Sequence, residues 1–259
     1  MSRTALTDRP SQSTSACTTL TVFCDFDGPI VDVSDRYYTT YQFGLADVQE
    51  QFGGRAIASL RNGIAPLSKA QFWQMKQNRV PDVEIAERSG LQGEQISWFM
   101  QRVCEIVNQP ALLHLDRLQP GVRWALELLH SQGARLVLVT LRERQQAMQF
   151  LHSHDLLHLF DRIWGATDDH AAYQNCADHK TQLLSEAIAV HSSDSAWMIG
   201  DTEADVLAGQ AAKVPTIALT CGIRSRRYLH QFNPNLIHSD LVSAVNSILY
   251  SNWRSQNFA

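Results

Sequence analysis

Short apolar runs alternate with helical patterns through the carboxyl-terminal half of the chain. The apolar runs span 134–141, 162–167, 196–201, 215–222 and, more weakly, 236–239. The stretches of helical character lie near 120–133, 143–154, 180–191 and 203–213. Short buried runs predict strands, and strands that alternate with helices predict a parallel sheet covered by helices on both faces.

The amino-terminal half has a different pattern. Residues 19–26 (TLTVFCDF) form another buried-strand run, which we expect to join the same sheet. From Ser34 to about Leu115 the apolar residues follow helical spacing, as at Tyr37 and Tyr41, and no convincing strand occurs. The sequence therefore predicts an α/β fold, a Rossmann-like parallel sheet with helices on both faces, plus an all-helical insertion after the first strand.

These patterns divide the chain into a core and an inserted helical domain. We expect the core to comprise residues 19–33 and 116–250 and the helical domain to comprise 34–115. Residues 1–18 are rich in Ser and Thr and predict a disordered tail, while 251–259 are expected to form a C-terminal tail.

Composition and charge exclude several classes of protein. Of the 259 residues, 44% are hydrophobic and 19% are charged, as in ordinary globular proteins. The formal net charge of -4 gives no reason to expect a nucleic-acid or membrane-surface partner. No apolar run approaches the roughly 18–20 residues of a membrane-spanning helix. The five cysteines form no CxxC pair, which indicates free thiols and predicts a cytoplasmic protein.

Acidic and hydroxyl side chains end three of the predicted strands. Asp25 and Asp27 end the first strand, Thr140 ends a second and Asp201 ends a third. The carboxyl ends of parallel strands meet at one edge of a sheet, so we expect these side chains to lie close together. Carboxylates this close repel one another, and Mg²⁺, which prefers oxygen ligands, removes that repulsion. The sequence therefore predicts a site for Mg²⁺ and a phosphoryl group.

The same residues resemble a known family. The segments DFDGPIVD, LVLVT and GDTEAD, with Lys180 before the last of them, resemble in this order the four signature motifs of the haloacid dehalogenase (HAD) superfamily. The helical insertion directly after the first motif is similar to the cap of the phosphoglycolate phosphatase and β-phosphoglucomutase branch. The resemblance covers the chain from about residue 20 to 250.

The resemblance implies a role for each matched residue. Asp25 would be the nucleophile that forms an aspartyl-phosphate, and Asp27 would be the general acid and base. Thr140 would hold a phosphoryl oxygen, and Lys180 would neutralise charge on the nucleophile and the transferring group.

The resemblance also implies a set of metal ligands. Asp25, Asp27 through its main-chain carbonyl, and Asp201 would bind Mg²⁺, while Asp205 would bind it or orient its waters. The dehalogenases of the superfamily lack the second aspartate of the first motif, so the presence of Asp27 favours phosphoryl transfer.

Two further positions are candidates for binding the substrate. Arg142 follows Thr140 where many relatives have small or polar residues. The segment 61–79 concentrates Arg61, Lys69, Lys76 and Arg79 among apolar residues. A basic cap edge would close over the site and recognise an anionic leaving group, with Lys76 as the first candidate. The alternative is that these side chains belong to solvated helix faces.

Together these features predict a Mg²⁺-dependent phosphatase, that is, a phosphoric monoester hydrolase. The resemblance implies a small phosphomonoester as substrate, such as 2-phosphoglycolate or a sugar phosphate, and a monomer or homodimer. Two alternatives remain open: a phosphomutase of the β-phosphoglucomutase type, and a catalytically silent binding or regulatory module. Intact Asp25, Asp27, Lys180 and Asp201 argue against the silent module.

Overall fold

The computed structural model of the chain describes residues 19–56, 64–167, 171–191, 193 and 195–258. The predicted tail 1–18 and Arg61 lie outside these residues. None of the helices within the described ranges combines the length and the apolar character that crossing a membrane would require.

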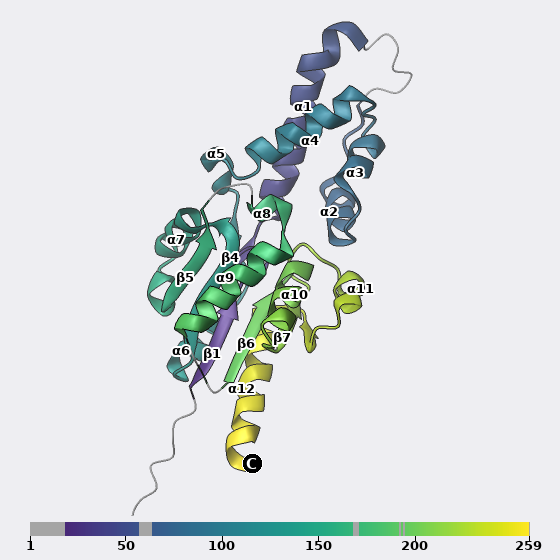
Figure 1. Cartoon of the computed structure of the whole chain (residues 1–259). Coiled ribbons are helices and arrows are strands. Elements are labelled where there is room, and N and C mark those ends of the chain that lie inside the picture. The colour runs from purple at the N-terminus through teal and green to yellow at the C-terminus, as the bar shows by residue number, and fades with distance from the viewer. Residues whose placement is uncertain (1–18, 57–63, 168–170, 192, 194, 259) are drawn as a thin grey trace, which may run out of the picture.

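A six-stranded parallel sheet forms the centre of the core, as the apolar runs predict (Figure 1). Its strands lie in the order β5-β4-β1-β6-β7-β8. Their bounds are β1 Leu20–Cys24, β4 Arg135–Glu143, β5 Arg162–Ala166, β6 Ser195–Gly200, β7 Thr216–Leu219 and β8 Leu236–His238. After β1 the chain forms β4 and β5 on one side of β1, and it then crosses to form β6, β7 and β8 on the other side. This reversal of strand order creates a topological switch point beside β1.

Helices cover both faces of this sheet. The helices α6 (Val122–Ser131), α7 (Arg144–Ser153) and α12 (Leu241–Phe258) pack on one face, and α9 (Ala177–Val190) and α10 (Glu203–Ala211) pack on the other. Strand alternation divides the core between the faces, because Val22 and Cys24 belong to the first cluster and Phe23 to the second. The predicted fold class is confirmed.

Within the described residues, five helices lie between β1 and α6 along the chain and beyond the carboxyl ends of the strands (Figure 1). They are α1 Ser34–Ala56, α2 Lys69–Gln77, α3 Asp82–Arg88, α4 Glu94–Ile106 and α5 Pro110–Leu113. We call them the cap. The predicted helical character of this insertion is confirmed for its described residues, whereas its exact boundaries as a domain stay predictions.

Several shorter elements complete the fold. A two-stranded antiparallel sheet, β2 (Val31–Asp32) with β3 (Arg117–Leu118), ties the two chain segments that enter and leave the cap. Two residues per strand are too few to give a periodic pattern, so the sequence did not reveal it. The remaining helices are α8 Ala171–Gln174, α11 Arg226–Leu229, η1 Leu157–Leu159 and η2 His230–Phe232. The predicted tail 251–259 continues α12 as far as Phe258.

Candidate active site

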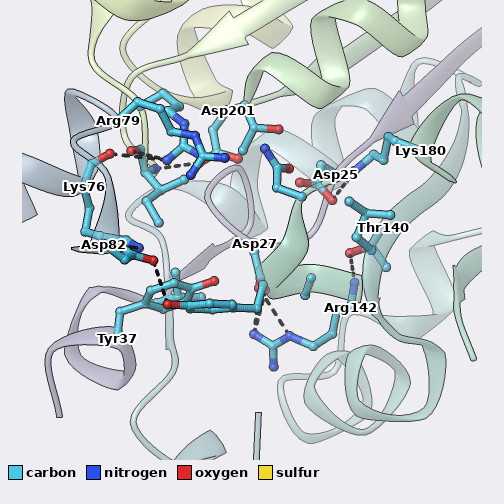
Figure 2. A pocket seen from close by; sticks show the side chains of 18 residues that line it. Asp25, Asp27, Tyr37, Lys76, Arg79, Asp82, Thr140, Arg142, Lys180 and Asp201 are labelled. Carbon is cyan, nitrogen blue, oxygen red and sulfur yellow. Dashed lines mark hydrogen bonds and ion pairs between the residues drawn. The ribbon is translucent and has the colours of Figure 1, made fainter. Parts of the chain in front are cut away.

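The predicted site residues meet in one pocket between the sheet and the cap. Asp25 follows β1, Thr140 lies on β4 and Asp201 follows β6, the three strands that lie side by side. The pocket is lined by these three residues together with Asp27, Lys76, Arg142 and Lys180. Figure 2 shows Asp25, Thr140 and Lys180 on one side and Lys76, Arg79 and Asp82 on the other. Asp205 is buried behind the pocket wall, beside Lys180.

Three buried carboxylates form a cluster at the carboxyl ends of the strands. Asp25, Asp201 and Asp205 each offer an oxygen, and these oxygens lie within 4.8 Å of one another. Burial raises the pKa of Asp25 to about 7, although Lys180 opposes the shift. Burial and the neighbouring carboxylates also raise the pKa of Asp201 well above its ordinary value. A carboxylate cluster that resists ionisation is stabilised by a cation.

Lys180 supplies one positive charge to this cluster. It lies in the first turns of α9, and its Nζ is 2.7 Å from Asp25 Oδ1 and 2.7 Å from Asp205 Oδ1. Burial alone would lower the pKa of Lys180, but the two carboxylates outweigh it and hold that pKa above the usual range. Lys180 is therefore a fixed cation beside Asp25.

Asp201 has one oxygen bound and one oxygen without a partner. The backbone N–H of Ile223 donates to Asp201 Oδ2 at 2.6 Å. Asp201 Oδ1 is buried and has no hydrogen-bond partner. A buried, unsatisfied carboxylate oxygen costs free energy unless a ligand binds it. Together with Asp25, this oxygen fits a divalent cation such as Mg²⁺, which takes carboxylate oxygens as ligands.

Glycines make room for the carboxylates of the cluster. A Cβ atom at Gly28 or Gly222 would overlap the carboxylate of Asp201, and a Cβ at Gly200 would overlap that of Asp205. Gly28 also has φ +91°, a conformation that L side chains rarely adopt. The chain therefore packs directly against Asp201 at Gly28 and Gly222 only because glycine has no side chain.

Asp205 is held by α10 itself. The backbone N–H and the hydroxyl of Thr202 both donate to Asp205 Oδ2, at 3.0 and 2.7 Å, in a capping box at the start of the helix. With Lys180 on its other oxygen, Asp205 has partners on both sides. This arrangement suits a residue that orients Lys180 and supports the cation site from behind.

The carboxylate of Asp27 is held by two arginines. Arg142 Nη2 lies 2.7 Å from Asp27 Oδ1, and Arg36 Nη2 lies 3.3 Å from Asp27 Oδ2. Asp116 joins both arginines, at 2.7 Å to Arg36 Nε and 3.1 Å to Arg142 Nη2. Burial would raise the pKa of Asp27, but Arg142 and Arg36 outweigh it and hold that pKa below its usual range.

Sequence reasoning missed Arg36 and Asp116, as well as the pocket residues Asp82, Tyr173 and Arg224. Arg36 and Asp116 are buried, and Arg36 also donates to Val107 O and to Asn108 at the end of α4. Arg36 occupies the first turn of α1, where a cation is unfavourable to the helix dipole, but this weak local signal does not reveal its partners. The network exists only because α1, the segment after α4 and β4 meet in space.

Thr140 and Arg142 lie on the same side of β4. Positions two apart on a strand share a face, so both side chains turn toward the pocket. The backbone N–H of Arg142 donates to Thr140 Oγ1 at 3.0 Å. The Thr140 hydroxyl accepts this bond and keeps its own proton for another acceptor, while the guanidinium of Arg142 is occupied by Asp27 and Asp116.

Lys76 forms part of the cap wall of the pocket. Its Nζ lies 2.7 Å from Asp82 Oδ1, and it sits 5.7 and 5.4 Å from the ring centroids of Tyr37 and Tyr173. Tyr173, from α8 of the core, donates its hydroxyl to Asp82 Oδ2 at 2.7 Å. Lys76 is thus buried at the pocket and not on a solvated face.

The other two described basic residues of that segment differ: Lys69 lies outside the pocket lining and Arg79 is part of it. Lys69 pairs with Asp35 and both side chains are well exposed, as the solvated-face alternative predicts. Arg79 crosses from the cap to Glu203 of the core at 3.1 Å.

Comparisons with known proteins agree with this geometry. A family model for haloacid dehalogenase-like hydrolases matches residues 22–219, more than half of the chain. The chain belongs to the haloacid dehalogenase-like hydrolase family. The predicted enzyme class, a phosphatase of this family, is confirmed.

Individual relatives are similar at low identity. The “Probable phosphatase IndB” of Dickeya dadantii is 27% identical over 231 residues, 88% of this chain and 94% of that protein. A phosphoglycolate phosphatase of Pseudomonas savastanoi pv. phaseolicola is 26% identical over 231 residues, 86% of this chain and 78% of that protein. A haloacid dehalogenase-like family hydrolase from Streptococcus pneumoniae has the same fold, with a TM-score of 0.61, 21% identity, and coverage of 89% of this chain and 98% of that one.

Proposed function

We propose that the protein is a Mg²⁺-dependent phosphatase that hydrolyses a small phosphomonoester through an aspartyl-phosphate on Asp25. One observation carries the proposal: Asp25 lies beside the fixed cation Lys180 and within the cluster that contains the unsatisfied Asp201 Oδ1. A phosphate that enters there meets a carboxylate nucleophile, an ammonium group and the Thr140 hydroxyl. These are the groups that phosphoryl transfer requires for positioning and for charge stabilisation.

The proposed reaction has two steps. A carboxylate oxygen of Asp25 attacks phosphorus, the bond from phosphorus to the leaving oxygen breaks, and Asp27 gives that oxygen a proton. Water then attacks the aspartyl-phosphate, its proton passes to Asp27, and Asp25 is released with inorganic phosphate. Lys180 and Thr140 hold the phosphoryl oxygens through both steps, and Asp205 holds Lys180.

The bound Mg²⁺ would supply charge neutralisation between the phosphoryl oxygens and the carboxylates. Asp25, Asp201 and the main-chain carbonyl of Asp27 would hold it, with Asp205 behind them. The carboxylate of Asp27 faces Arg142 and Arg36, which favour its anionic form. It is therefore ready to accept the proton of water in the second step, and it must move off these arginines to carry a proton to the leaving oxygen in the first.

The pocket favours a small, anionic substrate. It has a free volume of about 60 Å³, room for only a few water molecules, which matches a compact molecule. Four carboxylates and five basic side chains line it, so its lining carries a surplus of positive charge even without a metal ion. The surplus lies toward Lys76, Arg79 and Arg224, where a leaving group would sit.

This charge arrangement supports 2-phosphoglycolate, whose carboxylate would approach Lys76, and it also suits an acidic sugar phosphate. The similarity to phosphoglycolate phosphatases points the same way. Lys76 and Arg142 are proposed to shape this substrate site, Lys76 by charge and Arg142 by holding Asp27. The cytoplasmic location stays a prediction.

Phosphate release tests the proposal. The purified protein is incubated with a panel of small phosphomonoesters, including 2-phosphoglycolate and several sugar phosphates, with Mg²⁺ or with EDTA. We expect Mg²⁺-dependent release from at least one compound, abolished by EDTA and by Asp25→Asn. Release from no compound, by a folded protein that binds Mg²⁺, would contradict the phosphatase and favour a phosphomutase or a binding module.

A further inference from the structure

One core loop lies between the cation site and the cap. Residues 222–225 follow β7, and we call them the 222–225 loop. On its inner side, the N–H of Ile223 donates to Asp201 Oδ2 at 2.6 Å. Gly222 packs so closely on the same carboxylate that no Cβ fits there. The loop therefore sets the position of Asp201 directly.

On its outer side, the same loop binds the end of α2 in the cap. The backbone N–H of Ser225 donates to Gln77 O at 2.8 Å, and Arg224 Nη1 donates to Lys76 O at 3.3 Å. Gln77 Nε2 returns a bond to Gly222 O at 3.4 Å. The loop therefore contacts both sides: Ile223 binds Asp201, and the next two residues, Arg224 and Ser225, bind the end of α2.

Arg224 also anchors the loop to the helix that carries Asp205. Its Nε lies 2.7 Å from Glu203 Oε2 and its Nη2 lies 3.3 Å from Glu203 Oε1, in a largely buried bidentate pair. Arg79 of the cap reaches the same carboxylate at 3.1 Å. Arg79 has φ +58°, a conformation unusual for a residue with a side chain, at the turn that ends the cap helix. Glu203 is therefore a shared acceptor for one arginine from each side of the pocket.

We infer that Arg224 is a positioning residue that links cap closure to cation binding at Asp201. When the cap is seated, its carbonyls and Arg79 fix the loop, and Ile223 then holds Asp201 with Oδ1 directed at the cation site. When the cap moves away, Arg224 loses Lys76 O and Ser225 loses Gln77 O, while Arg224 keeps Glu203 of the core. The N–H of Ile223 is then held less firmly against Asp201. By linkage, a cation at Asp201 favours the seated cap to the same degree that the seated cap favours the cation. The inference rests on the proposed Mg²⁺ site.

Calorimetric titration of the full chain with Mg²⁺ alone tests this linkage without any turnover. Arg224→Met removes the anchor and, with it, a positive charge near Asp201; the loss of that charge alone would strengthen cation binding, so weaker binding reports the lost anchor. Ser225→Pro removes the N–H that binds Gln77, at a residue whose φ of -74° suits proline. Ser225→Ala is its matched control, because it loses the same hydroxyl and keeps the N–H. We expect Arg224→Met, and Ser225→Pro relative to Ser225→Ala, to raise the Mg²⁺ dissociation constant roughly fivefold or more.

Two more variants separate linkage from a general loss of structure. Arg79→Gly removes the cap arginine and places glycine at a positive φ, so we expect weaker Mg²⁺ binding with no loss of stability. Arg102→Ala removes a cap arginine that pairs with Asp47 far from the pocket, and should bind Mg²⁺ as the wild type does. In the wild type, Mg²⁺ should also slow hydrogen exchange at the Ser225 amide.

The outcomes distinguish the inference from the proposed function. If Arg224→Met, Ser225→Pro and Arg79→Gly all bind Mg²⁺ within about twofold of their references, the linkage is contradicted while the phosphatase stands. If the wild type binds no Mg²⁺, both the proposed cation site and the linkage are contradicted. Should Arg224→Met fail to fold, the Ser225 pair and Arg79→Gly decide the question.

Discussion

At the scale of single residues, the proposed cation site depends on Asp201, whose two carboxylate oxygens have different hydrogen-bond partners. Asp201 Oδ2 is satisfied by the backbone, and Oδ1 is buried without a partner. A purely structural aspartate would have both oxygens satisfied, because an orphaned buried oxygen costs about 1–3 kcal/mol. The asymmetry indicates that a ligand completes the site, and it makes Asp201 the most exacting of the predicted metal residues.

The glycine beside Asp201 gives a prediction at this scale. Gly222→Ala places a Cβ atom where the Asp201 carboxylate lies, so the carboxylate must turn away. We expect Mg²⁺ affinity and kcat/KM to fall at least about tenfold, as for residues that orient metal ligands. Gly133→Ala is the control, because its Cβ would meet open space and only its φ of +74° is unfavourable.

Calorimetry, phosphate release and urea unfolding compare the two glycine variants. Gly133→Ala should lose stability and keep both Mg²⁺ binding and activity. Equal Mg²⁺ affinity in Gly222→Ala and the wild type would show that Asp201 does not bind the cation from its observed position.

The sequence was sufficient for the residues that end strands and insufficient for those that support them. Asp25, Thr140 and Asp201 were predictable because the carboxyl ends of neighbouring parallel strands converge whatever the loops do. Arg36 and Asp116 were not predictable, because their charges make sense only once three distant segments are packed together. For the same reason, the sequence did not show that Asp27 and Asp116 occupy the guanidinium of Arg142.

At the scale of elements, the cap is joined to the core on both sides of the pocket. On one side the end of α2 binds the 222–225 loop, and on the other α3 meets α8 through Asp82 and Tyr173. Helical periodicity predicts α1 and α4, since each has an apolar face of several turns. It is weaker in the shorter α2 and α3. It does not predict which short turns touch across the pocket, because these contacts involve polar residues with no period.

The bond between α3 and α8 predicts a dependence of stability on pH. Burial would raise the pKa of Asp82, but Lys76 and the Tyr173 hydroxyl outweigh it and lower that pKa in the folded state. A carboxyl with a lowered pKa stabilises the fold above its unfolded pKa of about 4 and loses this contribution as the pH falls through its folded pKa.

Asp82→Asn should therefore be less stable than the wild type by roughly 1.5–3 kcal/mol at pH 7, the range for a hydrogen bond to a charged group. The difference should shrink as the pH falls below about 4, where the wild-type carboxyl becomes protonated and resembles the amide. Urea unfolding of both proteins at several pH values measures it. A difference that stays constant from pH 7 to the acid range would contradict the ion pair.

At the scale of the whole molecule, the chain combines a parallel-sheet core that holds the proposed reacting groups with a helical cap that lines the other side of the pocket. The core contributes the carboxylates, Lys180 and Thr140, and the cap contributes Lys76 and Arg79. The fold class, and the separation of the pocket residues between core and cap, follow from the order of strands and helices in the sequence. The substrate does not, because a few cap side chains determine it and fold alone does not fix function.

The central claim is that Asp25 carries the phosphoryl group during the reaction. The most direct measurement is mass spectrometry of Asp27→Asn, quenched in acid after brief exposure to substrate and Mg²⁺. The substrate is a phosphomonoester with a good leaving group, which needs no acid in the first step, so Asp25 is still phosphorylated. Without Asp27 as base, hydrolysis of the intermediate should slow by roughly a hundredfold or more, and the phosphorylated protein should accumulate. The account predicts one added phosphoryl group on the peptide that contains Asp25, absent from Asp25→Asn. Product formation with no phosphorylated peptide, or a phosphoryl group on another residue, would contradict it.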